Sequence, residues 1–315
     1  MIRVENLTKY YGETVGVRDL NFQVETGEVL GFLGPNGAGK TTTMKMLTCY
    51  LPPSAGTAKV SGFDIIEQSM EVRKRIGYLP ERNPLYTEMS VRAYLGFVAR
   101  VKGIRPPAQR GQIDGVIERC GLETVHRRTI EKLSKGYQQR VGIAQAILGD
   151  PEILILDEPT LGLDPKQIIE IRQLIRNLGG EKTVVLSSHI LPEVSQVCNR
   201  VIIINHGELI AVDTPDNLRS RLAKAAILRL AFRDEGDAAA RASRILESIK
   251  GVLIVRQEPG GDNARIFTVE CAPDRDIREE IARALVGERI PLLELYREEL
   301  SLEDIFLQLV TEEVS

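Results

Sequence analysis

Residues 34–41, Gly-Pro-Asn-Gly-Ala-Gly-Lys-Thr, have the spacing GxxxxGK followed by Ser or Thr. Glycines let the backbone wrap around phosphate groups with its N–H groups pointing inward. In such a loop Lys40 reaches the β- and γ-phosphates, and the Thr41 hydroxyl group binds Mg²⁺. The strand-like run VLGFL precedes the loop and a helical pattern follows it, which is the context the motif requires. We assign the following residues to nucleotide binding: Gly34, Pro35, Asn36, Gly37, Ala38, Gly39, Lys40, Thr41 and Thr42.

Two carboxylates, Asp157 and Glu158, end the apolar run ILILD. At the carboxyl end of a strand beside a phosphate loop, Asp157 is placed to hold Mg²⁺, and Glu158 to orient or deprotonate an attacking water. A strand ending in Asp-Glu is by itself more typical of a simple turn, but the neighbouring loop favours the catalytic interpretation. His189 follows a second apolar run, VVLSS, and is expected at the same sheet edge. The predicted catalytic residues are therefore Glu158, His189 and Lys40.

A second segment also has the residues of an anion site. In KLSKGYQQR, residues 132–140, Ser134 and Gly136 stand where an amphipathic run begins to read as a helix. A hydroxyl group and free backbone N–H groups at a helix start can bind an anion. The chain thus carries two predicted phosphate sites, and the residues alone do not explain why one nucleotide would need both.

The elements that must position these residues follow from hydrophobic periodicity. Residues 1–30 alternate apolar and polar side chains, which is typical of strands joined by turns. After Lys40 the pattern becomes helical until a Pro-Pro pair stops it. The apolar runs at 153–157 and 184–188 are bounded by helical patterns, as buried parallel strands are. The sequence therefore predicts an α/β core.

An inserted segment, about residues 82–150, is predicted to be mostly helical. One helix covers residues 87–103 with Ser90 as a plausible N-cap, and a second covers about 109–120 after Pro-Pro interrupts the pattern. Near residues 213–222 the pattern changes again, and a linker is expected there.

The C-terminal module, residues 225–315, alternates in the order β-α-β-β-α-β, the ferredoxin-like arrangement, and is closed by the run SLEDIFLQLV. We expect a small α+β domain in dimerisation or regulation, because it contains no site-like residues. The expected fold is thus an α/β P-loop core with a helical insert plus this module.

Composition excludes several classes of protein. A net charge of −3 gives no general basic field, so no nucleic acid partner is expected. The four cysteines have no CxxC spacing and are interpreted as reduced packing residues in a cytosolic protein. No apolar run approaches the roughly 20 residues that span a bilayer, and the N-terminus lacks the apolar region of a signal peptide. Any membrane role is expected to be peripheral, without direct insertion.

The order GPNGAGKTT, LSKGYQQR, ILILDEP, GLDP and SSH is similar to that of ABC-type ATPase subunits, over about residues 1–220. The resemblance implies ATP and Mg²⁺ as cofactors and two nucleotide-binding domains packed head to tail. Ser134 and Gly136 of one copy would then bind the γ-phosphate held by the P-loop of a second copy. Two phosphate sites would serve one nucleotide from different subunits of a homodimer.

The resemblance also implies roles for single residues. Tyr11, in KYYG, matches the aromatic residue that stacks on adenine, with an ordinary strand aromatic as the alternative. Asp164, in GLDP, matches an aspartate that communicates across the dimer, and His189 matches the switch histidine at the γ-phosphate. Glu81 stands where the family usually has glutamine; it is expected near the nucleotide and Mg²⁺, with a solvated loop carboxylate as the alternative. The segment LSKGYQQR, residues 133–140, corresponds to the signature of the family, and in it Tyr137 stands where the family usually has glutamine.

The GYLPE segment, the single nucleotide-binding domain and the C-terminal extension resemble ATPases of ABC-2-type exporters, including the gliding-motility and copper-site-maturation types. This implies an ATPase on the cytoplasmic face of the membrane, attached through a separate permease subunit. The expected docking surface is residues 82–104, with NPLY and the apolar positions Val91, Leu95 and Val98; packing within the insert is the alternative.

Two other function classes stay open. An importer ATPase would share the coupling surface. A soluble ABC ATPase acting on ribosomes or DNA is disfavoured, because ribosomal types resemble two nucleotide domains in one chain and only one P-loop is present. The stretch between Lys40 and Ser134 also lacks the sustained heptads of DNA-repair types.

Overall fold

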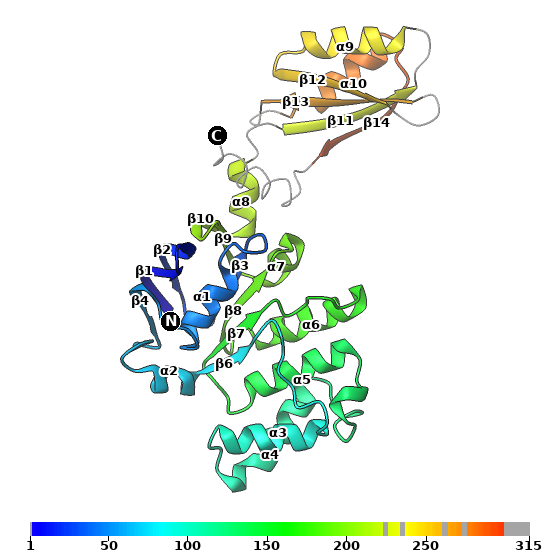
Figure 1. Cartoon of the computed structure of the whole chain (residues 1–315). Coiled ribbons are helices and arrows are strands. Elements are labelled where there is room, and N and C mark those ends of the chain that lie inside the picture. The colour runs from blue at the N-terminus through cyan, green and yellow to red at the C-terminus, as the bar shows by residue number, and fades with distance from the viewer. Residues whose placement is uncertain (1, 223–225, 234–236, 260–263, 273–275, 299–315) are drawn as a thin grey trace. The chain divides into compact units, whose positions relative to one another are not determined.

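The computed structural model describes residues 2–222, 226–233, 237–259, 264–272 and 276–298 (Figure 1). The chain divides into two compact units, Met1–Pro215 and Asp216–Ser315. Each unit builds its own sheets around its own hydrophobic core. The fold class expected from the sequence is confirmed, while the domain boundaries at 220 and 225 stay a prediction.

A six-stranded sheet forms the centre of the first unit, in the order β10-β9-β3-β8-β7-β6. Five neighbouring strands run parallel, and β10 joins the edge antiparallel to β9. Every residue of β3, β7 and β8 is buried, which explains their unbroken apolar runs. The strands are β3 (Val29–Leu33), β6 (Ile76–Leu79), β7 (Ile153–Asp157), β8 (Thr183–Ser188), β9 (Arg200–Asn205) and β10 (Glu208–Asp213).

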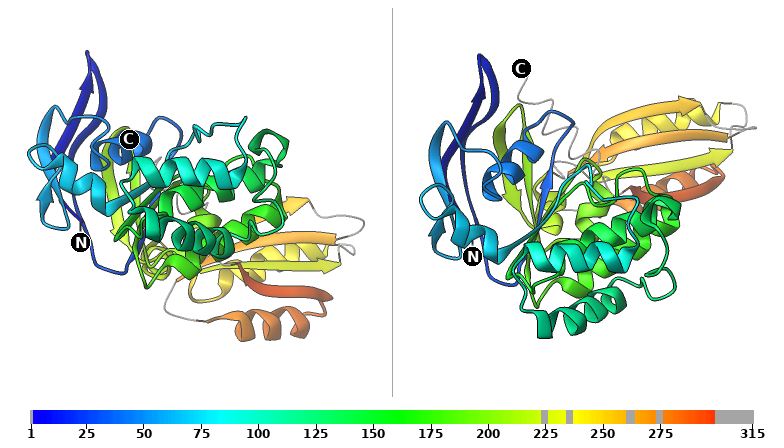
Figure 2. Two further views of the ribbon diagram at one scale, coloured as in Figure 1. Left: turned by 90° about the horizontal axis from the view of Figure 1, so that it is seen from below. Right: turned by 60° about the horizontal axis from the view of Figure 1, so that its bottom comes forward.

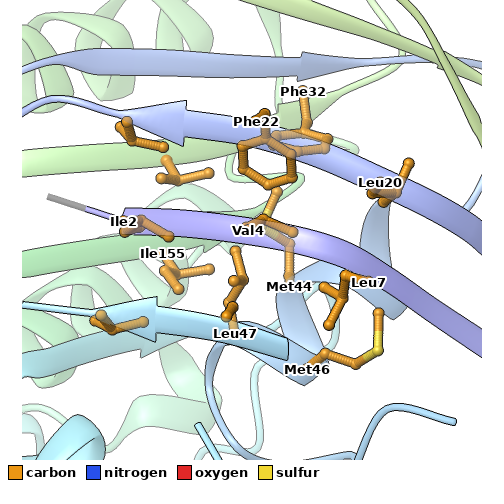
Figure 3. Close-up of a cluster of buried hydrophobic side chains, with 14 of the residues drawn as sticks. Ile2, Val4, Leu7, Leu20, Phe22, Phe32, Met44, Met46, Leu47 and Ile155 are labelled. Carbon is orange, nitrogen blue, oxygen red and sulfur yellow. The ribbon is translucent and has the colours of Figure 1, made fainter. Parts of the chain in front are cut away.

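A second sheet, antiparallel and ordered β2-β1-β4-β5, covers one face of the first with helix α1 between them. Side chains from both sheets and α1 fill this layer, as Figure 3 shows for Phe22, Phe32, Met44 and Ile155. Because α1 is embedded in this core, the loop before it has a fixed position over the sheet. The elements are β1 (Ile2–Tyr11), β2 (Thr14–Val24), α1 (Lys40–Leu47), β4 (Ala55–Val60), β5 (Phe63–Asp64) and the nearby α2 (Ser69–Arg75).

Helices cover the opposite face of the parallel sheet, and two strand glycines let them approach closely. An added Cβ on Gly31 of β3 would lie 2.1 Å from Cγ1 of Val194, and one on Gly77 of β6 would lie 2.2 Å from the carbonyl oxygen of Ala146. Any side chain at either position would therefore push a helix away from the sheet. These helices are α5 (Lys135–Ile147), α6 (Pro165–Leu178) and α7 (Leu191–Val197), and α8 (Pro215–Leu222) begins where this unit ends.

The predicted helical insert is present as α3 (Val91–Val101), α4 (Pro106–Arg119), the short 3-10 turn η1 (Ile130–Lys132) and α5. Figures 1 and 2 show α3 and α4, in teal, on a different side of the parallel sheet from the blue antiparallel strands. Ser90 caps α3 as predicted, because its side chain accepts from the backbone N–H of Ala93. The predicted start of the second helix at 109 is wrong, since Pro106 and Pro107 form its first turn, where no N–H is needed.

Three residues expected on a docking surface are instead buried. Val91, Leu95 and Val98 face the interior of the insert, where α4 and α5 pack against α3. Their spacing marks one apolar face of a helix, and that face is covered by the chain's own helices. The docking interpretation is therefore wrong for these three residues.

The second unit has the element order β-α-β-β-α-β that the sequence predicts, with an antiparallel sheet ordered β12-β13-β11-β14. Its helices pack on one face of the sheet around buried Leu230, Phe232, Phe267 and Ile281. The run SLEDIFLQLV lies outside the described residues. The elements are β11 (Ala226–Arg233), α9 (Ala238–Ser248), β12 (Val252–Pro259), β13 (Ala264–Cys271), α10 (Arg278–Gly287) and β14 (Leu292–Glu298).

Across the described residues, no helix combines the length and the apolar character needed to cross a membrane.

Candidate functional site

The glycine-rich loop joins the end of β3 to the start of α1, as the motif requires. Gly39 has a φ of 106°, in the left-handed region that favours glycine, and an added Cβ there would lie 2.5 Å from Cγ1 of Val17. An added Cβ on Gly34 would lie 2.3 Å from the carbonyl oxygen of Ile204. The loop is thus pressed against β2 and β9, and its path is set by contacts that exclude side chains.

Lys40, the first residue of α1, is buried beneath this loop. Its ammonium group donates to the carbonyl oxygens of Gly34 at 2.7 Å and Pro35 at 3.2 Å. It also lies 3.3 Å from Oε1 of Glu158. A positive charge is therefore held where a phosphate in the loop would meet it.

Asp157 ends β7 inside a hydrogen-bond network. Its Oδ1 accepts from the hydroxyl groups of Thr41 at 3.1 Å and Ser187 at 2.6 Å, whereas its buried Oδ2 has no hydrogen-bond partner among the described residues. Burial raises the pKa of this carboxyl group, the two hydroxyl groups offset part of the shift, and the charges of Glu81 and Glu158 add to it. A buried carboxylate oxygen without a hydrogen-bond partner, with the charges of Glu81 and Glu158 near it, is suited to bind a cation.

The donors at this point fit Mg²⁺. That ion usually takes one or two protein oxygens and completes its shell with phosphate oxygens and water, and Thr41 and Asp157 supply two oxygens beside the phosphate loop. Within the described ranges, no three His, Cys, Asp or Glu side chains gather closely enough to hold a metal ion by themselves. Glu81 as a further metal ligand stays a prediction.

Glu158 is buried, and both its backbone and its carboxylate are held by neighbouring residues. Its backbone has a φ of 48°, an unusual conformation for a glutamate that costs about 1–3 kcal/mol. Its N–H donates to Oγ of Ser187 at 2.9 Å, and Oε2 lies 3.0 Å from Nδ1 of His189. With Lys40 at Oε1, the carboxylate is fixed between a cation and an imidazole. Ser187 was not predicted; the serine pair that ends VVLSS is the signal that identifies it.

Part of the predicted site meets at one cavity of about 430 Å³, lined by Tyr11, Thr42, Glu81, Glu158 and His189 together with Asn36, Gly37, Gly39, Lys40 and Thr41 of the glycine-rich loop. The hydroxyl group of Tyr11 lies 3.4 Å from Oγ1 of Thr42, and its ring is about half exposed. An aromatic ring presented at the mouth of a phosphate site is placed to stack on a base.

Ser134, Gly136 and Asp164 lie at a different cavity, of about 230 Å³, which shares no lining residue with the first. Ser134 caps α5, and Asp164 caps α6 by accepting from the N–H of Gln167 at 2.9 Å. An added Cβ on Gly136 would lie 2.5 Å from Cδ of Gln167, so a side chain at this position would displace the Gln167 amide. The structure therefore places the two predicted phosphate sites of one chain at separate cavities.

Comparisons with known proteins agree with this geometry. The family described as ABC transporter matches residues 17–161. Bacitracin transport ATP-binding protein BcrA of Bacillus licheniformis is 35% identical over 98% of this chain and 97% of its own length. Linearmycin resistance ATP-binding protein LnrL of Bacillus subtilis (strain 168) is 32% identical over 98% of each chain.

Solved structures show the same core. A dimeric post-hydrolysis state of the ATP-binding cassette MJ0796, bound to ADP and Pi, superposes with a TM-score of 0.62 at 25% identity, covering 68% of this chain and 98% of that one. The cbiO1 structure from Clostridium perfringens gives a TM-score of 0.64 at 29% identity, covering 70% of this chain and 90% of the other.

Proposed function

The chain belongs to the family of ABC transporter ATP-binding proteins, and from this membership we propose that it hydrolyses MgATP as a homodimer to power a separate membrane-spanning exporter. The single observation that carries the proposal is the placement of Glu158 between Lys40 and His189, beside Asp157 and the P-loop. The two full-length relatives are named for bacitracin transport and linearmycin resistance. These names favour an exporter over an importer and over an ATPase that acts on ribosomes or nucleic acid.

In the proposed reaction the chain's own groups bind the phosphates, orient the general base and accept a proton. The P-loop N–H groups and Lys40 bind the phosphates, and Glu158 accepts a proton from the attacking water. His189 orients the Glu158 carboxylate through Nδ1 and presents the rest of its ring toward the cavity that takes the γ-phosphate. When bound at Thr41 and Asp157, Mg²⁺ would supply charge neutralisation for the phosphates.

Two copies are proposed to complete each site. The separation of Ser134 and Gly136 from the P-loop cavity leaves the signature helix start without a phosphate from its own chain. A head-to-tail partner would place its α5 N-terminus over the γ-phosphate, where the backbone N–H groups and the Ser134 hydroxyl can donate. The solved cassette that is dimeric with ADP and Pi supports this arrangement.

The permease is proposed to dock along a groove next to the insert. A cavity of about 980 Å³ is lined by Tyr50, Arg82 and Pro84, and it also reaches Glu81, which borders the nucleotide cavity. Two residues after Pro84 in the chain, Tyr86 is 57% exposed and contacts the ring of Phe97 edge to face. A partner segment held here would contact the loop that carries Glu81, and would keep the ATPase on the cytoplasmic face of the membrane without inserting it.

The C-terminal module, residues 225–315, is proposed to serve dimerisation or regulation rather than catalysis. In the part of it that the structure describes, the helices use one sheet face to build a separate core. Both full-length relatives extend over this region, since they cover 98% of the chain.

Co-expression with the proposed permease subunit tests the proposal. The wild-type chain should hydrolyse ATP and should pellet with membranes only when the permease is present. Tyr86→Ala should weaken pelleting about tenfold, since tyrosine is enriched among the interface positions whose truncation weakens binding most. Tyr296→Ala, an exposed tyrosine of the second unit, is the matched control and should pellet normally. Tight binding to protein-free liposomes would contradict partner-mediated attachment.

A further inference from the structure

Glu193, on α7, is a buried carboxylate that the proposed reaction does not use. Its residue is 5% exposed, and Oε2 accepts hydrogen bonds from two hydroxyl groups, those of Thr160 and, at 3.2 Å, Ser188. Oε1 lies 3.9 Å from Nη2 of Arg172 on α6. A buried charge that receives two hydroxyl donors and a cation is well compensated, and such networks fix geometry strongly.

The two donors stand next to the two proposed catalytic groups. Thr160 follows Glu158 by two residues, and Ser188 directly precedes His189. Thr160 and Ser188 are themselves buried, so neither hydroxyl group has solvent as a substitute partner. One carboxylate therefore ties the turn after β7 to the turn after β8.

Ser187 and Ser188, at the end of β8, lie on opposite faces of the sheet and have different hydrogen-bond partners. Successive strand residues point to opposite faces. Ser187 donates to Asp157 and accepts from the N–H of Glu158, while Ser188 donates to Glu193 and accepts from the N–H of Ile190 at 3.0 Å. The ends of β7 and β8 are thus tied together directly by Ser187 on one face, and through Glu193 by Thr160 and Ser188.

We propose that Glu193 is a positioning residue that sets the distance between the Glu158 carboxylate and the His189 ring. The inference rests on the proposed roles of these two groups. Only 3.0 Å separates Oε2 of Glu158 from Nδ1 of His189, and a hydrogen bond of that length is lost when either turn moves by about 1 Å. Glu193 acts at a distance from the nucleotide and does not line its cavity.

Steady-state ATPase kinetics of the full-length chain tests this role. Glu193→Gln keeps the shape but loses the charge, and should lower kcat about tenfold while KM for ATP stays within about twofold. Thr160→Val removes one donor at constant volume and should lower kcat in the same direction. Thr160→Ser restores that donor and should restore turnover. Glu181→Gln, an exposed glutamate paired with Arg119 at 2.8 Å, is the matched control and should behave as wild type.

A double-mutant cycle separates positioning from general destabilisation. In a His189→Ala background, Thr160→Val and Glu193→Gln should change the remaining kcat less than about twofold, because the group they position is gone. An equal fold-loss in both backgrounds, or a Thr160→Ser loss as large as that of Thr160→Val, would overturn the inference. If Glu193→Gln does not fold, the comparison of Thr160→Val with Thr160→Ser tests the inference by itself. Should Glu158→Gln and His189→Ala retain full turnover, the site assignment fails instead, which is a distinguishable result.

Discussion

The ammonium group of Lys40 lies 3.3 Å from Oε1 of Glu158, and both side chains are buried. The proposed phosphate-binding cation and the proposed general base therefore neutralise each other. In the proposed reaction a γ-phosphate in the loop would compete with Glu158 for this cation, and nucleotide binding would be linked to activation of the base through one ion pair.

Replacing Glu158 by Gln should separate binding from hydrolysis. The amide cannot accept a proton, so turnover should fall at least about a hundredfold. ATP should bind at least as tightly as to wild type, because Lys40 no longer has a carboxylate competitor, and an ATP-bound dimer should accumulate. Single-turnover hydrolysis and size-exclusion chromatography measure the two effects. Near-normal steady-state ATPase in purified Glu158→Gln protein would remove Glu158 from its assigned role.

The signature should act across the dimer interface. Ser134→Arg places bulk and charge where two copies meet and should block hydrolysis, as should Lys40→Ala in the P-loop. Mixing the two variants forms heterodimers that hold one site with both halves intact, so part of the ATPase activity should return. Activity that stays at the sum of the two variants, under conditions where heterodimers are demonstrated, would show that each chain uses its own signature.

Glu81 borders both the nucleotide cavity and the proposed docking groove, and should therefore affect coupling more than affinity. Glu81→Gln should leave the Kd for ATP within a few fold while changing the stimulation of ATPase by the permease. Isothermal titration of the isolated chain and ATPase assays with the permease measure the two quantities. A large loss of ATP affinity would instead make Glu81 a principal contact of the nucleotide or metal.

Asp157 should make stability depend on pH. Because folding raises the pKa of this carboxyl group above its ordinary value of 3.8, the folded state holds the proton more tightly than the unfolded chain. Raising the pH from the pKa of the unfolded chain to the higher pKa of the folded state therefore lowers the free energy of unfolding. Without Mg²⁺ or nucleotide, Asp157→Asn should have a higher Tm than wild type at neutral pH, and the difference should shrink as acid protonates Asp157.

The same variant gives a control for the metal assignment. Added Mg²⁺ with nucleotide should raise the Tm of the wild-type chain and have a smaller effect on Asp157→Asn, which lacks the anionic ligand.

The pH prediction has its own contradicting outcome. A Tm difference between wild type and Asp157→Asn that does not change with pH would show that the substitution acts through packing.

Local sequence patterns were enough to predict the P-loop, the strand that ends at Asp157 and the cap at Ser90, because each depends on residues close together in the chain. The positions of Val91 and Leu95 were not predictable in the same way. Helical periodicity shows that one face is apolar, but whether that face meets the chain's own helices or a partner depends on tertiary packing.

Glu193 illustrates a second limit. Its partners Thr160 and Arg172 belong to other elements, and nothing in the local pattern of α7 distinguishes it from an exposed glutamate in a first helical turn. A polar network between residues far apart in the sequence cannot be predicted from local patterns, because it depends on how the strands and helices pack.

The left-handed backbone at Glu158 has an implication for protein engineering. Glycine adopts a φ of 48° without penalty, and asparagine with less than glutamate. A glycine at position 158 would relieve this strain and would also remove the proposed general base, so a screen for heat resistance alone would not protect the proposed activity. Directed evolution of this chain therefore needs selection for ATP turnover beside selection for stability, because the proposed general base is one of the positions with a left-handed backbone.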